Sequence, residues 1–138
     1  MKKPLHLVKL CVGIDSLEHY EAVAAKRRGR DAQGRQFHVT RMVPRRAAEV
    51  VGNSIYWVIR GSIQCRQTIE AIEPFEDEEG VRRCRIVLGE RIVPVEWKRK
   101  RPFQGWRYLK GKPPADLPEG AAGLPAALRH ELLELGLM

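Results

Sequence analysis

The sequence lacks the short motifs by which many nucleotide-dependent enzymes are identified. It contains no P-loop and no G-x-G-x-x-G segment, which argues against nucleotide-dependent phosphoryl transfer and against a dinucleotide-binding fold. Its histidines and cysteines show none of the close pairings, such as C-x₂-C or H-x₃-H, that zinc sites need. We therefore expect no metal and no other cofactor, and no motif in the sequence identifies a reaction.

Cysteines are few and long apolar runs are missing. Cys11, Cys65 and Cys84 are odd in number and widely spaced, which is typical of buried thiols in a reduced compartment, so we expect a cytoplasmic protein. No apolar stretch approaches the roughly 20 residues of a membrane-spanning helix, so we expect no membrane partner. The apolar run near the N-terminus is interrupted by His6 and Lys9, and we interpret it as a strand and not as a signal peptide.

Acidic residues are outnumbered by basic ones. Twenty-five Lys and Arg against 17 Asp and Glu give a formal net charge of +8, which favours nucleic acid or another anionic partner. Residues 26–46 carry eight basic residues against one acidic residue, and residues 82–112 carry eleven against two. If these two basic blocks fold onto one face, they form a positive patch. A basic surface without such a partner is the open alternative.

The densest part of the second basic block is 97–112, WKRKRPFQGWRYLKGK. It holds seven basic residues, four of the nine aromatic residues of the chain and no acidic residue. Phosphates pair with Lys and Arg, and nucleobases stack on aromatic rings, so this composition suits a nucleic acid. We therefore expect nucleic acid as the probable partner, with RNA favoured.

Hydrophobic periodicity predicts strands and helices that do not alternate as βαβ units. We therefore expect an α+β fold, built on a small curved, mostly antiparallel β-sheet or pseudo-barrel with two or three flanking helices. The expected strands cover residues 5–12, 36–43, 54–60, 62–74, 81–88, 91–98 and 105–110, and the expected helices cover 15–28, 44–51 and 125–135.

We expect three regions along the chain. Residues 1–112 form a single α+β domain, residues 113–123 form a linker rich in Pro, Gly and Ala, and residues 124–138 form an amphipathic helix. We expect this last helix to pack on the domain through an apolar stripe formed by Leu124, Leu128, Leu132 and Leu135.

Local signals mark the starts of two helices. Asp15 is placed as an N-cap, with Glu18 three residues later to complete a capping box. Pro44 suits the first turn of the second helix. Arg45 and Arg46 then lie in that turn, where cations oppose the helix dipole and are easier to explain if an anion binds.

Alternation also assigns the faces of the two central strands. In the first, Ile55, Trp57 and Ile59 share one face. In the second, which follows a hinge at Gly61, a polar face is expected to contain Gln64, Arg66, Thr68 and Glu70. A long strand with one polar face is typical of a curved antiparallel sheet or small barrel.

Three segments together resemble an uncharacterised bacterial family known only as a domain of unknown function. They are residues 38–46 (HVTRMVPRR), 56–67 (YWVIRGSIQCRQ) and 101–110 (RPFQGWRYLK), and the likeness runs from about residue 5 to residue 117. The three motifs are fairly specific as a set. The family has no established activity, so the resemblance implies no particular reaction.

More distantly, the order of helix, strand, short helix, long strand and hairpin resembles the PUA-like superfamily, which includes PUA, ASCH and EVE domains. Most of these domains bind RNA or modified bases in a cleft beside a small barrel, and a few ASCH members are enzymes that act on nucleic acid or nucleoside-like molecules. The resemblance therefore implies a PUA-like domain that binds RNA or a modified nucleotide. The basic loop at 27–34 has no counterpart in that plan.

The leading hypothesis is a binding module with a basic cleft between the short helix at 44–51 and the sheet. In it, arginines hold phosphate, polar side chains of the long strand read base edges, and a tryptophan stacks on a base. These roles are assigned, in that order, to Arg41, Arg45 and Arg46, to Gln64 and Arg66, and to Trp106. The nucleic-acid interface also includes Lys98, Arg99, Lys100, Arg101 and Arg107, whose contacts with phosphate would weaken steeply with salt.

Each assignment has a structural alternative that the sequence leaves open. Trp106 can close the hydrophobic core, and Arg66 can pair with Glu70. Arg41 can pair with a backbone carbonyl, and the run 98–101 can be a solvated loop.

The second hypothesis is a small enzyme acting on a nucleoside-like or anionic substrate in the same cleft. His38 and Glu70 are the only candidates for moving a proton there. A closed cavity with either side chain pointing inward favours chemistry, whereas an open groove lined with arginine favours binding. Whether the protein is an enzyme therefore stays open at this stage.

Overall fold

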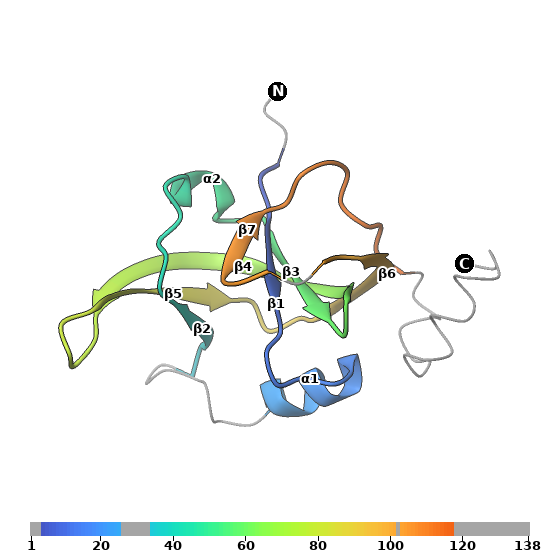
Figure 1. Cartoon of the computed structure of the whole chain (residues 1–138), viewed down its shortest axis with the longest axis horizontal. Helices are drawn as coiled ribbons and strands as arrows, with labels where there is room; N and C mark the ends of the chain where they lie inside the picture. Colours follow the sequence, from blue (N-terminus) through green and yellow to red (C-terminus); the bar gives the residue numbers. More distant parts are fainter. Residues whose placement is uncertain (1–3, 26–33, 102, 118–138) are drawn as a thin grey trace.

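The longest element among the described residues is a 15-residue strand, β4, around which a curved sheet is arranged (Figure 1). The computed structural model describes residues 4–25, 34–101 and 103–117. In chain order the elements are β1 (Leu7–Leu10), α1 (Leu17–Ala25), β2 (Gln36–Thr40), α2 (Ala47–Val50), β3 (Ser54–Ile59), β4 (Ser62–Glu76), β5 (Arg82–Leu88), β6 (Val93–Arg99) and β7 (Trp106–Tyr108).

The strands form one open, curved sheet in the order β2-β5-β4-β3-β1-β7, with β6 paired to β4 off this path. Only β1 and β3 run parallel among the described strand pairs, and the others are antiparallel. The first half of β4 pairs with β3 and β6, whereas its second half pairs with β5. This arrangement confirms the expected α+β fold with a curved, mostly antiparallel sheet and small flanking helices.

The hinge expected at Gly61 is a two-residue turn between β3 and β4. Arg60 and Gly61 have φ values of 49° and 79°, the left-handed backbone that tight hairpin turns of the I′ type require at both positions. The expected face of β3 is also confirmed, because Ile55, Trp57 and Ile59 all lie in one buried cluster.

Both faces of the sheet are covered. The larger core lies on the side of α1 and includes Leu17 and Tyr20 of that helix, together with Trp57 and Trp106 of the sheet. The smaller core lies on the other face and contains Val8, Tyr56, Val58, Ile63 and Val95, with Leu10, Phe103 and Leu109 packed against it. Leu109 follows β7, so the chain beyond the last strand contributes to covering the second face.

Both helices differ in detail from the sequence prediction. The N-cap of α1 is Ser16 and not Asp15, because the Ser16 hydroxyl accepts a hydrogen bond from the His19 amide at 3.0 Å. In a capping box, a side chain of the first turn accepts a hydrogen bond from a backbone amide before the helix. Here His19, and not the expected Glu18, has this role, because the His19 Nδ1 atom accepts from the Asp15 amide at 3.1 Å. The helix expected over residues 44–51 is a single turn, α2, preceded by Pro44.

The part of the chain from residue 118 onwards lies outside the described residues. The second half of the expected linker and the whole of the expected C-terminal helix at 124–138 therefore stay predictions. The basic loop expected at 27–34 also lies almost wholly outside the described residues.

A polar network is buried inside the larger core, around the fully buried Gln67. The Gln67 side-chain oxygen accepts hydrogen bonds from the Tyr20 hydroxyl and, at 2.9 Å, from the Trp57 indole. Its side-chain nitrogen donates to Gln36 and to the Gly89 carbonyl, both at 3.1 Å. The network links α1, β2, β3 and β4, and every polar atom of the Gln67 side chain has a partner.

Candidate functional site

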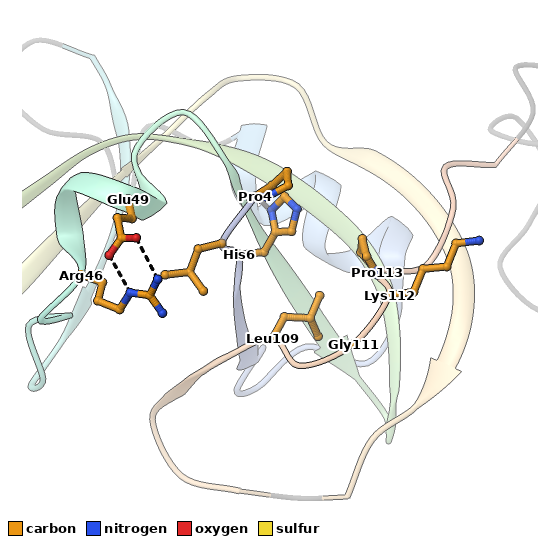
Figure 2. A pocket seen from close by; sticks show the side chains of 9 residues that line it. Pro4, His6, Arg46, Glu49, Leu109, Gly111, Lys112 and Pro113 are labelled. Atoms are coloured by element: carbon orange, nitrogen blue, oxygen red, sulfur yellow. Dashed lines mark hydrogen bonds and ion pairs between the residues drawn. The ribbon is translucent and has the colours of Figure 1, made fainter. Parts of the chain in front are cut away.

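A pocket among the described residues lies beside α2, at the end of the sheet where β3 begins (Figure 2). Its volume is about 860 Å³, within the range of small-molecule sites. Three separate parts of the chain supply its walls: the residues before β1, helix α2, and the segment that follows β7. The lining residues are Pro4, Leu5, His6, Arg46, Glu49, Leu109, Gly111, Lys112 and Pro113.

Arg46 and Glu49 form an ion pair on one wall of this pocket (Figure 2). The Glu49 carboxylate accepts two hydrogen bonds from the Arg46 guanidinium, at 2.6 and 2.8 Å. The Arg46 amide also donates to the Tyr108 hydroxyl at 3.1 Å, which ties the start of α2 to β7. The hydrogen bond and charge of Glu49 raise the pKa of Arg46, so the guanidinium stays charged but is already occupied.

His6 lines the pocket with a fixed ring orientation. Its Nδ1 accepts a hydrogen bond from the Ser54 amide at 3.0 Å, and its ring packs edge-on against Tyr56 at a centroid distance of 5.3 Å. Burial lowers the pKa of His6, and the positive charge of Arg66 lowers it further. His6 is therefore a neutral imidazole at pH 7.

Arg66 does not line the pocket, but it contacts Ser54, the partner of His6. Two of its guanidinium nitrogens donate to the Asp116 carboxylate at 2.8 Å each, and the third donates to the Ser54 hydroxyl at 3.0 Å. The partner of Arg66 is thus Asp116, and the pairing with Glu70 that the sequence left open is not formed. Ser54 also orients His6, so Arg66 is connected to His6 through Ser54.

Of the three arginines expected to hold phosphate, Arg46 is the one that lines the pocket. Arg41 and Arg45 are exposed on the connection between β2 and α2. They flank the site without entering it, so their assignment stays a prediction.

Gln64 and Arg66, which were both expected to read base edges, do not share a site. Gln64 is 3% exposed, at an irregularity of β4, and its side-chain nitrogen donates to the Ile59 carbonyl at 2.9 Å. Its side-chain oxygen is buried without a hydrogen-bond partner. This burial gives Gln64 no route to a base edge in the pocket.

Trp106 closes the larger core, in agreement with the structural alternative that the sequence left open. It is 6% exposed, its indole donates to the Met42 carbonyl at 2.8 Å, and its ring packs edge-on against Tyr108 with centroids 4.9 Å apart. A base has no exposed face of Trp106 on which to stack, so we exclude this residue from the proposed site.

The cation run Lys98, Arg99, Lys100 and Arg101 lies at the end of β6, beside the turn between β3 and β4. The Lys100 amide donates to the Gly61 carbonyl at 2.9 Å, which fixes this position. Lys98 reaches toward the pocket, since its ammonium donates to the Lys112 carbonyl at 3.4 Å. Arg107 is exposed, and its guanidinium lies 5.6 Å from the ring centre of Phe103.

The two basic blocks meet at their ends. The Met42 carbonyl and the Arg46 amide, from the first block, contact Trp106 and Tyr108 of the second. Arg46 and Lys112 then line the same pocket. The cations of the second block from Lys98 to Arg101 do not line it.

His38 lines a second, smaller pocket of about 140 Å³, together with Tyr20 and Gln36. Burial, assisted by the charge of Lys9, lowers the pKa of His38 to about 4. Glu70 is exposed and lines neither of the two pockets. Neither of the two proton-transfer candidates named from the sequence therefore lines the larger pocket, whose titratable residues are instead His6, Arg46, Glu49 and Lys112.

Sequence reasoning missed three polar residues of the larger pocket: His6, Glu49 and Lys112. They come from three distant parts of the chain, and their spacing carries no motif. The parallel pairing of β1 with β3 and the pairing of β1 with β7 bring them together. Grouping these three residues into one pocket requires the strand order of the sheet, which cannot be deduced from the sequence pattern.

None of the helices in the described ranges has the length and apolarity that crossing a lipid bilayer requires. The described residues also include no group of three His, Cys, Asp or Glu side chains that could hold a metal ion.

Neither a curated protein nor a solved structure matches the chain. One family model does match, over residues 7–138, and its description is "Protein of unknown function (DUF1489)". Because this match covers nearly the whole chain, the protein belongs to the DUF1489 family.

Proposed function

We propose that the protein is an RNA- or modified-nucleotide-binding module of the PUA-like kind, and that the pocket beside α2 is its ligand site. The observation that carries the proposal is the make-up of this pocket. Two cations, Arg46 and Lys112, lie on opposite sides of it in Figure 2, with His6 and Leu109 between them. A nucleotide combines an anionic phosphate with a flat ring. This pocket offers apolar Leu109 for the ring and Lys112 for the phosphate, whereas the Arg46 guanidinium is shared with the Glu49 carboxylate.

The surface around the pocket supports a longer polyanion. Arg41 and Arg45 precede α2, Lys98–Arg101 lie at the end of β6, and Arg107 lies on β7. Among the described residues, none of these cations has an ion-pair partner. Such exposed cations are free to neutralise phosphates and to release counterions when they do.

Its position also fits the proposal. The pocket lies beside the short helix α2, in the region between this helix and the sheet where the binding hypothesis expects a basic cleft. A cytoplasmic location agrees with this role and with the three free cysteines.

The test is binding of the purified full chain to fluorescent single-stranded RNA, structured RNA and duplex DNA across a salt series. We expect submicromolar binding that prefers one RNA class and survives moderate salt. Lys112→Gln and Arg46→Gln should each weaken binding. Each should also lower the slope of log K against log salt by about 0.7–0.9 for every phosphate that the variant no longer neutralises.

The matched control is Arg82→Gln, which removes one charge from an exposed position on β5, away from the pocket. It should bind RNA as the wild type does. If Arg82→Gln weakens binding as much as Lys112→Gln, or if all nucleic acids bind weakly and only at low salt, the positive charge is generic and the proposal is wrong.

A further inference from the structure

His6 lines the pocket, and its two ring nitrogens differ in their hydrogen bonding. Its Nδ1 is occupied as an acceptor of the Ser54 amide hydrogen at 3.0 Å. A neutral imidazole carries its single proton on the other nitrogen when one nitrogen accepts, so the Nε2 atom bears the hydrogen. Among the described residues, nothing accepts a hydrogen bond from this N–H group.

The structure also resists protonation of this ring. A second proton would have to sit on Nδ1, directly opposite the Ser54 amide hydrogen, and would break that hydrogen bond. The guanidinium of Arg66, bound to the hydroxyl of the same Ser54, adds repulsion between positive charges. His6 therefore keeps one tautomer and one orientation, so a ligand group next to its Nε2 atom always meets a hydrogen-bond donor.

We infer that His6 selects a nucleotide whose base turns a carbonyl oxygen toward its Nε2–H, so that the pocket favours keto bases over amino bases. This inference rests on the proposed function. Leu109 and Pro113 provide apolar walls for the ring of the base, and two cations line the same pocket: Arg46, which is paired with Glu49, and Lys112. An amino group at the same position would place two donors face to face and leave both without a partner.

Uridine and cytidine monophosphate are the sharpest pair of probes, because they carry a carbonyl and an amino group at the same ring position. We expect calorimetry with the full chain to give roughly tenfold tighter binding of the uridine nucleotide, the size of discrimination expected when one hydrogen bond is replaced by an unpaired donor. Guanosine and adenosine monophosphate should show the same preference for the carbonyl.

The variant that isolates this role is His6→Asn. The asparagine side-chain oxygen can take the place of Nδ1 and accept from the Ser54 amide, but the chain then has no group at the position of Nε2. We expect His6→Asn to fold, to bind both nucleotides, and to lose the preference between them. Nitrogen NMR of the free protein at pH 7 should show His6 neutral, with its proton on Nε2.

The outcomes separate this inference from the proposed function. Equal binding of the two nucleotides by the wild type, an unchanged preference in His6→Asn, or a His6 ring protonated on Nδ1 overturns the inference alone. Failure of every nucleotide and RNA to bind, or RNA binding that Lys112→Gln does not weaken, overturns the proposed function and the inference together.

Discussion

The guanidinium of Arg66 and the carboxylate of Asp116 face each other edge to edge, joined by two hydrogen bonds of 2.8 Å. Asp116 belongs to the stretch after β7 that runs along β6, where the Glu96 amide donates to the Ala115 carbonyl and the Leu117 amide to the Pro94 carbonyl. The pair therefore fastens this stretch to the central strand β4. The same arginine orders Ser54, which orients His6 in the pocket.

We predict that Asp116→Asn destabilises the protein by at most about 1 kcal/mol at pH 7, because the side chains of Arg66 and Asp116 are 25% and 47% exposed and solvent screens the pair. Arg66 lowers the pKa of Asp116, so the contribution of the pair is present above the unfolded pKa and is lost as the pH falls through the folded value. Urea unfolding of both proteins at several pH values measures this difference. If the stability difference between wild type and Asp116→Asn grows as the pH falls, the Arg66–Asp116 pair is not its cause.

We predict that Glu49→Gln strengthens the binding of RNA and nucleotides about two- to fivefold at low salt, because it releases the Arg46 guanidinium from its carboxylate partner. The control is Glu73→Gln, which changes the net charge equally but removes a partner of Arg35 and Arg85, neither of which lines the pocket. Equal effects of the two variants would mean that net charge, and not Arg46, controls affinity.

His38 should make the protein less stable in mild acid. Its folded pKa of about 4 is below the ordinary histidine value of 6.5, so the unfolded chain binds a proton more readily and stability rises with pH between these values. The loss on going from pH 7 to pH 4 is on the order of 3 kcal/mol. His38→Phe should flatten this part of the stability curve, while the contribution of His6, whose pKa is also lowered, remains. Parallel curves for wild type and variant would show that His38 is not the cause.

Replacing Gln67 should be among the most damaging single changes. Gln67→Leu leaves the Trp57 indole and the Gly89 carbonyl without partners in the core, and we expect a loss of about 2–4 kcal/mol in the free energy of unfolding. Tyr20→Phe, which removes one hydroxyl from the same network, should cost less. Urea denaturation of the two variants gives the comparison, and a Gln67→Leu protein as stable as wild type would show that the network does not stabilise the fold.

The sequence predicted the strands well where alternation is regular, and failed at an irregularity. Ile55, Trp57 and Ile59 share a face as expected. In β4, the pairing with both neighbours shifts near Gln64, so the expected polar face from Gln64 to Glu70 is not continuous. A bulge inserts one residue without changing the hydrophobic pattern, so alternation alone does not reveal it.

The candidate site was predicted only in outline. Arg46 and the cleft beside the short helix followed from a local signal, namely cations at the start of a helix. His6 and Lys112 depend on how β1 inserts between β3 and β7, which is a property of the whole chain. Trp106 was assigned wrongly for a different reason. An aromatic residue among cations has the same sequence pattern whether its ring faces a ligand or the core.

The placement of β1 also constrains the order in which the protein can fold. This first strand has no partner near it in the sequence: Leu7 pairs with Ile55 on one side and with Tyr108 on the other. By contrast, β3, β4 and β5 follow one another and pair through short connections, which cost less chain entropy to close. During synthesis the N-terminal strand must therefore wait until β3 has emerged for its first partner, and until β7 has emerged for its second. The β3–β4–β5 meander is then the expected folding nucleus, and the pocket walls assemble last.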